Sequence, residues 1–186
     1  RELERQPVEF LALERRLPEL LDAARERLAA DVRASPANLA FALRASPALN
    51  AVARSLELGP GDEVLLGDAE YGGMQILWAF VAERTGATLV HRPFDELVPG
   101  PRTRVVFCSH VEWTSGRVND VAAVCRLARE AGAPSIVDGA HAPGQIDLDL
   151  EALGADVYTG NCHKWLCAPK CSAFLYARPD AQLLID

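Results

Sequence analysis

The pattern of apolar and polar positions divides the chain into one long helix followed by short apolar runs that alternate with helices. From about Phe10 to Val32, apolar side chains recur at helical spacing, and arginine and glutamate fill the opposite face. After Pro36 the apolar positions become consecutive and the runs become short. We expect strands over residues 39–43, 64–66, 88–91, 105–108, 135–137, 157–159 and 173–176, and helices near residues 47–56, 74–85, 120–131 and 148–153.

Strand runs that are apolar on both faces and separated by helices indicate a parallel sheet covered on both sides. The pattern therefore predicts a single α/β domain over residues 1–186, with three layers and a mostly parallel central sheet. The chain begins at Arg1 and ends at Asp186, directly after an apolar strand, so we expect a fragment. In that case the last strand would expose an apolar edge that a second chain could cover.

Composition narrows the function classes. Apolar residues make up 49% of the 186 residues, enough for a real core, and the net charge of −7 argues against nucleic acid. No apolar run is long enough to cross a bilayer and no signal peptide opens the chain, which predicts a cytoplasmic protein without membrane contact. Five irregularly spaced cysteines indicate reduced thiols.

Ligands of parallel α/β sheets bind beyond the carboxyl ends of the strands, so the residues there are the candidates for chemistry. Ala45 and Ser46 follow the first strand at a helix start, which suits a phosphate but is equally an ordinary helix cap. Tyr71 follows the second strand and precedes two glycines. Its ring could lie flat on a planar ligand or simply cover the sheet edge. His110 follows the fourth strand, and on its own it does not indicate a catalytic role.

Two further strand ends carry charged residues. Asp138 ends an apolar strand, where a carboxylate is costly unless it meets a cation or several donors. Lys164 stands between His163 and Trp165 just beyond another apolar strand. Burial lowers the pKa of a lysine, and a neutral amine attacks an aldehyde. Together with an anion site and a stacking aromatic, these groups match a phosphorylated pyridine aldehyde, which is pyridoxal 5'-phosphate.

Two sequence blocks, residues 135–144 and 158–170, resemble the class V aminotransferases, pyridoxal-phosphate enzymes of fold type I. The resemblance is greatest to the isopenicillin-N-epimerase-like branch, which is related to cysteine desulfurases. Residues 7–20 and 56–64 are similar to that branch as well, so the resemblance covers nearly the whole chain. It implies the large domain of such an enzyme, without the N-terminal segment and the small C-terminal domain of the family.

The resemblance also implies roles for individual residues. Lys164 would hold the cofactor as an internal aldimine and move protons at the substrate α-carbon. Asp138 would pair with the pyridine nitrogen, His141 would lie near the phenolic oxygen, and Tyr71 would stack on the ring. The residues implied to meet the phosphate are Ala45, Ser46, Asn161 and His163. The run 44–47, Trp113 and Cys171 depart from the family pattern.

The function expected from the resemblance is pyridoxal-phosphate chemistry on an amino acid, of the epimerase or aminotransferase kind, in a homodimer without a metal. One rival is a cysteine desulfurase or C–S lyase, although no cysteine of this chain matches the desulfurase nucleophile. A second is a non-catalytic remnant that needs a partner chain. A third is a metal-binding module, whose spacing fits common zinc sites poorly and whose ligands would be Cys162, His163, Cys167 and Cys171.

Overall fold

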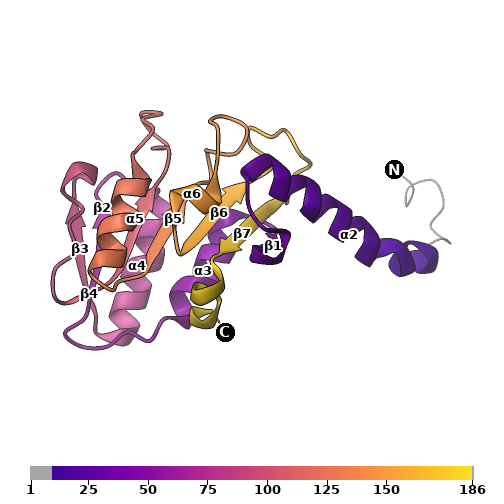
Figure 1. Cartoon of the computed structure of the whole chain (residues 1–186). Helices are drawn as coiled ribbons and strands as arrows, with labels where there is room; N and C mark the ends of the chain where they lie inside the picture. Colours follow the sequence, from indigo (N-terminus) through magenta and orange to yellow (C-terminus); the bar gives the residue numbers. More distant parts are fainter. Residues whose placement is uncertain (1–9, 186) are drawn as a thin grey trace.

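The computed structural model describes residues 10–185, which fold around one seven-stranded sheet (Figure 1). The α-helices are α2 (Phe10–Val32), α3 (Ala45–Ser55), α4 (Gly72–Thr85), α5 (Val121–Glu130) and α6 (Leu150–Leu153). The strands are β1 (Leu39–Ala42), β2 (Glu63–Gly67), β3 (Thr88–Arg92), β4 (Thr103–Ser109), β5 (Ser135–Asp138), β6 (Val157–Asn161) and β7 (Ala173–Ala177). Short 3-10 helices cover Pro36–Asn38, Phe94–Glu96 and Pro179–Leu184.

Every predicted strand and helix is confirmed, and the differences lie at the boundaries. Helix α3 begins at Ala45, before the predicted start at Pro47. Proline is tolerated in the first turn, where its missing N–H has no intrahelical partner, so Pro47 does not have to be the first helical residue. Helix α6 begins at Leu150 because the carboxylate of Asp149 accepts a hydrogen bond from Ala152 N and caps it.

The strand order is β1-β7-β6-β5-β4-β2-β3, which confirms a mostly parallel sheet. The neighbours from β3 through β6 are parallel, whereas β7 is antiparallel to both β6 and β1. A parallel crossover requires a long connection, usually a helix, and none lies between β6 and β7. Strand β1 therefore runs in the same direction as β6. The carboxyl ends of β1, β2, β4, β5 and β6 share one edge of the sheet with the start of β7.

The prediction that the last strand exposes an unpaired edge is wrong. Strand β7 lies between β1 and β6, and the two edge strands of the sheet are β1 and β3. The reason is that the short strand after the N-terminal helix adds to β7 in an antiparallel ladder, in which Leu39 pairs with Tyr176.

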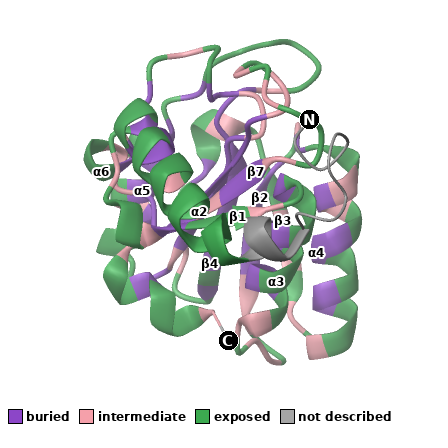
Figure 2. Ribbon diagram, turned by 90° about the vertical axis from the view of Figure 1, so that its right-hand side faces the viewer, coloured by how far each residue is buried: buried purple, intermediate pink, exposed green. Residues whose placement is uncertain are grey.

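Two apolar clusters form the layers on either side of the sheet. One cluster joins the end of α2, α5 and α6 to one sheet face through residues such as Val32, Val124 and Leu150. The other joins α3 and α4 to the opposite face, with Trp78 and Phe107 at its centre. Figure 2 shows the resulting arrangement, with buried strands inside and the outer faces of the helices exposed. The three-layer α/β/α prediction is confirmed.

Helix α2 packs on the domain only at its C-terminal end, and its N-terminal half projects away from the sheet (Figure 1). Leu28, Ala29 and Val32 are buried, whereas the apolar side chains two to three turns before Leu28, at Leu17, Leu20 and Leu21, are exposed. The helical periodicity is thus correct, but the apolar face is covered only in part. The resembling segment 7–20 begins outside the described residues. Within residues 10–185, no helix has both the length and the apolar character needed to cross a bilayer.

Candidate functional site

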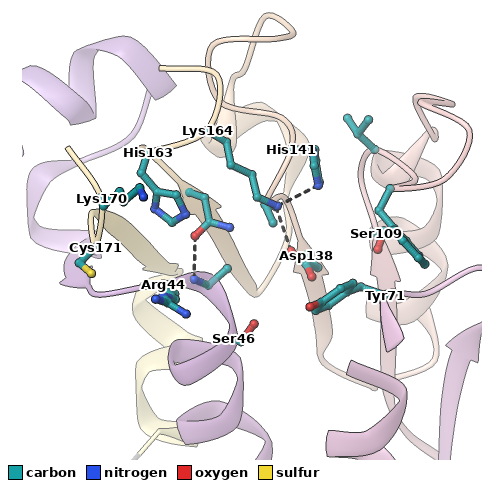
Figure 3. Close-up of a pocket in the computed structure, with 15 residues that line it drawn as sticks. Arg44, Ser46, Tyr71, Ser109, Asp138, His141, His163, Lys164, Lys170 and Cys171 are labelled. Atoms are coloured by element: carbon teal, nitrogen blue, oxygen red, sulfur yellow. Dashed lines mark hydrogen bonds between the residues drawn. The ribbon is translucent and has the colours of Figure 1, made fainter. Parts of the chain in front are cut away.

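A cavity of about 470 Å³ opens at the sheet edge where the parallel strands end (Figure 3). Its lining includes all eight residues that the sequence singled out as a site: Ala45, Ser46, Tyr71, Asp138, His141, Asn161, His163 and Lys164. The remaining lining residues are Arg44, Ser109, Val111, Trp113, Ala140, Lys170 and Cys171. These side chains come from the carboxyl ends of five strands, β1, β2, β4, β5 and β6, and from the loop between β6 and β7. The structure therefore brings the predicted residues into one place.

The carboxylate of Asp138 lies at the floor of the cavity and is only 6% exposed. Its Oδ1 accepts a hydrogen bond of 2.9 Å from Ala140 N. Burial raises the pKa of this carboxyl, and the hydrogen bond from Ala140 and the charge of Lys164 oppose the rise. Among the described residues, Asp138 has no ion pair and its Oδ2 accepts no hydrogen bond. A buried carboxylate oxygen is thus left for a cationic group of a ligand.

The amine of Lys164 points into the same part of the cavity as that carboxylate and lies 2.8 Å from Nε2 of His141 (Figure 3). Burial lowers the pKa of Lys164, while the negative charge of Asp138 acts in the opposite direction. The chain has only two lysines, and the second, Lys170, lines the same cavity. Lys164 is half-buried and Lys170 is exposed. The partial burial of Lys164 favours a neutral, nucleophilic amine.

The loop that carries Lys164 is fixed by backbone hydrogen bonds and by a close approach to Gly144. Cys162 N and His163 N both donate to Ser172 O, so the two ends of the loop are joined. Gly144 has a φ of +81°, and a Cβ atom there would lie 2.6 Å from the carbonyl carbon of Trp165. Only glycine fits this approach, which sets the position of the backbone directly after Lys164.

Gly144→Ala should lower the free energy of unfolding and displace the Lys164 loop. The matched control is Gly132→Ala, because Gly132 also has a positive φ, of +71°, but has nothing within 4 Å of an added Cβ. Gly132→Ala should lower the free energy of unfolding by about 1–2 kcal/mol, because alanine is strained in the left-handed region. Gly144→Ala should lower it by a further ~1–3 kcal/mol, because its Cβ also overlaps the backbone of Trp165. Urea unfolding of both variants measures the difference. Equal losses would show that the contact with Trp165 does not matter.

The start of helix α3 offers fewer backbone donors than its position suggests. The N–H of Ala45 donates to Oδ1 of Asn161 at 2.9 Å, and Pro47 has no N–H. Ala45 therefore lines the cavity without a free donor, whereas Ser46 keeps its N–H and hydroxyl. The same bond points the Oδ1 of Asn161 toward the helix, which leaves its NH₂ group as the donor.

Basic side chains add to the donors at this end of the cavity. Arg44, His163 and Lys170 lie on the same side as Ser46, opposite Tyr71 (Figure 3). His163 is held by a 2.9 Å hydrogen bond between its Nδ1 and the carbonyl of Ser172. Side-chain charge thus supplements the helix start as the anion-binding element.

Tyr71 forms an aromatic wall of the cavity and is 46% exposed. Gly73 leaves room for its ring, since a Cβ atom at Gly73 would lie 2.7 Å from Cε1 of Tyr71. The edge of Trp113 meets the ring at a centroid distance of 5.8 Å and an angle of 84°. The aromatic residue and the glycine that follows it therefore act as a unit that keeps one ring face available.

Glu70 is a buried residue of this region that the sequence reasoning missed. It is 4% exposed, and its Oε1 accepts a 2.9 Å hydrogen bond from Ser109 N while Oε2 pairs with Ser109 Oγ at 2.5 Å. Burial raises the pKa of Glu70 to about 8, opposed by the bonds from Ser109 and supported by the charges of Asp138 and Glu112. The sequence does contain a signal for this pair. Glu70 precedes Tyr71 at the end of one strand, and the neighbouring strand ends in Ser109.

The raised pKa of Glu70 predicts a pH-dependent stability. The folded state keeps the proton up to about pH 8, whereas the unfolded chain loses it near the ordinary value of 4.5. Unfolding between these values releases a proton, so the free energy of unfolding falls as pH rises, by at most about 1.4 kcal/mol per pH unit. Glu70→Gln should remove this slope, because an amide can bond Ser109 without titrating. Urea titrations from low to high pH test it, with exposed Glu83→Gln as control; an unchanged slope in Glu70→Gln would contradict it.

Two other predicted features lie outside the cavity or do not assemble. His110 is buried, bonds Tyr158 Oη through Nδ1 at 2.8 Å, and has its pKa lowered by burial to about 4. It is a structural residue.

Within the described part of the chain, no three His, Cys, Asp or Glu side chains gather as metal ligands, so the geometry does not support the metal-binding module.

The arrangement as a whole suits a flat, anionic ligand with a carbonyl group. It combines an anion-binding end, an aromatic wall, a buried carboxylate and an amine of lowered pKa. The groups that line the cavity therefore fit a phosphorylated pyridine aldehyde.

Comparisons with known proteins agree with this reading. Residues 9–185 match the model of the family described as aminotransferase class V. The chain is 44% identical to isopenicillin N epimerase of Amycolatopsis lactamdurans, over 94% of this chain and 47% of that protein. It is 31% identical to a probable cysteine desulfurase of Methanothermobacter thermautotrophicus, over 87% of this chain and 43% of that protein.

Among solved structures, the chain is similar to a mutant of C-DES with glycine covalently linked to its PLP cofactor. The TM-score is 0.90 at 26% identity, and the match covers 100% of this chain and 52% of the other. A second structure, described as the cystine C–S lyase C-DES with cysteine persulfide, has a TM-score of 0.89 at 26% identity, over 100% of this chain and 53% of that one. The chain spans about half the length of the relatives it matches.

Proposed function

The chain belongs to the class V aminotransferase family, and we propose that it is the cofactor-binding part of a pyridoxal-phosphate enzyme that carries its cofactor on Lys164. The observation that supports this most is the cavity itself, in which Lys164 and Asp138 face the same space beside an anion-binding end. The family and the PLP-bound neighbour identify the cofactor class. The assignment of Lys164 follows from what the family resemblance implies, and its half-buried position in the cavity and its lowered pKa support it.

The residues of the cavity form three groups, and each group would bind a different part of the cofactor. Asp138 would bind the protonated ring nitrogen through its free oxygen, and Tyr71 would cover one ring face; both line the cavity. His141 lies beside Lys164 and would meet the ring's phenolic oxygen. The groups that bind the phosphate are the N–H and hydroxyl of Ser46, the NH₂ of Asn161 and the side chains of Arg44, His163 and Lys170. When bound, pyridoxal phosphate supplies an electron sink that stabilises negative charge at the α-carbon of an amino acid.

The amine of Lys164 serves two purposes in this proposal. It would hold the cofactor covalently through Nζ, and as a free amine it would accept or donate a proton at the substrate α-carbon. A lowered pKa suits both, because the free amine is the nucleophile and the base. Asp138 contributes by keeping a positive charge on the opposite end of the ring, which strengthens the withdrawal of electrons.

The substrate is an amino acid, and the reaction class that we propose first is epimerisation or transamination. Its support is the 44% and 42% identity to two isopenicillin N epimerases, against 31% for a probable cysteine desulfurase. A second candidate, C–S bond cleavage, is favoured by the similarity to the C–S lyase C-DES. Product analysis of the full-length protein separates them, since only the second reaction releases reduced sulfur from a cysteine derivative.

The experiment that tests the cofactor assignment is reductive trapping. The protein is incubated with pyridoxal phosphate, reduced with borohydride, digested and mapped by mass spectrometry. Because the chain has two lysines, the map has few possible sites. A pyridoxyl group on Lys164 supports the proposal. Modification of Lys170 alone, or none at either lysine, would refute it.

Three predictions from the sequence stay proposals. Residues 1–186 form one cofactor-binding large domain, for which the single continuous sheet over β1 to β7 is the support. The active assembly is a homodimer, and the protein is cytoplasmic. Light scattering of the purified protein tests whether it is a homodimer, and cell fractionation tests whether it is cytoplasmic.

A further inference from the structure

Trp165 is a large aromatic residue that contributes little to the core. Its side chain is 52% exposed, and it follows Lys164 directly on the loop between β6 and β7. Its indole Nε1 lies 3.3 Å from Nδ1 of His141, and the two rings are tilted by 54° with centroids 6.5 Å apart. The contact is therefore an edge-on hydrogen bond and not a stack.

The direction of this hydrogen bond is fixed by chemistry. An indole N–H can only donate, so Nδ1 of His141 must be the acceptor and carries no proton. A neutral imidazole has one proton, which then resides on Nε2. That nitrogen lies 2.8 Å from Nζ of Lys164. An N–H group needs a lone pair opposite it, and among the two forms of lysine only the neutral amine has one.

The alternative protonation states are less favourable in this geometry. An ammonium group on Lys164 would set two donors against each other at 2.8 Å. Moving the histidine proton to Nδ1 would relieve that conflict but would set it against the indole N–H instead. Burial lowers the pKa of both Lys164 and His141, which acts in the same direction.

We propose that Trp165 is a positioning residue that acts through His141. Its indole N–H selects the imidazole tautomer protonated on Nε2, which donates to the lone pair of the Lys164 amine and so holds that amine in its neutral form. This inference rests on the proposed role of Lys164. In the capture of an aldehyde, the amine loses its two hydrogens and the aldehyde its oxygen, which leave as one water molecule. Only the neutral amine can begin that reaction.

The first test reads the tautomer directly. Nitrogen NMR of the cofactor-free protein should show His141 protonated on Nε2 in the wild type, and a mixture of both tautomers in Trp165→Phe. The matched control is Trp113→Phe, because Trp113 lines the same cavity, is 51% exposed and forms no hydrogen bond to His141 within residues 10–185. A wild type protonated on Nδ1, or a tautomer unchanged by Trp165→Phe, would overturn the inference.

The second test is the pH profile of covalent capture, measured by borohydride trapping of pyridoxal phosphate at short times. Trp165→Phe should shift the midpoint upward by roughly half to one pH unit and slow capture several-fold at neutral pH, roughly three- to tenfold. Trp113→Phe should leave the midpoint unchanged. The other ionisable groups around the amine are Asp138, Arg44, His163 and Lys170, with Glu70 behind them, and they are the same in all three proteins.

The outcomes separate this inference from the proposed function. If the wild type forms no adduct on Lys164, the proposed function fails. If it forms the adduct and Trp165→Phe has the wild-type midpoint, only the role of Trp165 fails. Because half of the indole is exposed, a folded Trp165→Phe protein is expected, and circular dichroism with thermal unfolding verifies it.

Discussion

Lys164→Ala should abolish the covalent capture of pyridoxal phosphate and the visible absorbance that accompanies it. The methyl group has no nucleophile to offer, and the remaining lysine, Lys170, lies at the anion-binding end of the cavity and not beside His141 (Figure 3). Non-covalent binding should survive, since the phosphate-binding groups remain. Intact-mass measurement after borohydride reduction gives the yield of adduct.

Lys170→Ala is the matched control for this experiment. It removes the only other lysine, so it should keep the adduct and weaken binding moderately through the loss of one charge near the phosphate. If Lys164→Ala retained a reducible adduct while Lys170→Ala lost it, the roles of the two lysines would be reversed.

Asp138→Asn should weaken the binding of pyridoxal phosphate strongly while leaving the cofactor-free protein at least as stable as the wild type. Removing one partner of a buried charge pair costs about 2–5 kcal/mol of affinity, which corresponds to a factor of tens to thousands. Without the ligand, the wild-type carboxylate is buried at 6% exposure with no ion pair among the described residues, so its replacement removes a cost. The asparagine oxygen can still accept the hydrogen bond from Ala140.

The measurement is thermal unfolding with and without pyridoxal phosphate. The wild type should gain stability with added cofactor, and Asp138→Asn should lose most of that gain. Asp68→Asn is the control, because Asp68 is exposed at the end of β2 on the same sheet edge. An undiminished gain in Asp138→Asn would remove the carboxylate from the proposed site.

The fold was largely predictable because each element has a local signal. Consecutive apolar positions mark the strands, and helices between them favour a parallel sheet, which the structure has from β2 to β6. The direction of β7 depends on the absence of a helix between β6 and β7, and the sequence of that loop contains no helical pattern. The place of β1 beside β7 depends on long-range pairing, which no local pattern encodes.

The site was predictable for a different reason. Parallel strands bring their ends to one edge, so the residues after each strand could be grouped without coordinates. What the sequence could not reveal is which donors are already in use. The N–H of Ala45 is occupied by Asn161, and Trp165 is bonded to His141, because backbone turns bring them together across more than 20 residues. The buried Glu70–Ser109 pair was missed for the same reason.

The scarcity of lysine has a practical consequence. Two of the 19 cationic side chains are lysines, both at the cavity, and the rest are arginines, which do not react with succinimidyl esters or isothiocyanates. Within residues 1–186, such dyes and cross-linkers would attach to side chains only around the proposed active centre. A fluorophore attached to these lysines would report whether the cavity is occupied. Immobilising the protein on a surface through its amines would instead block the entrance of the cavity.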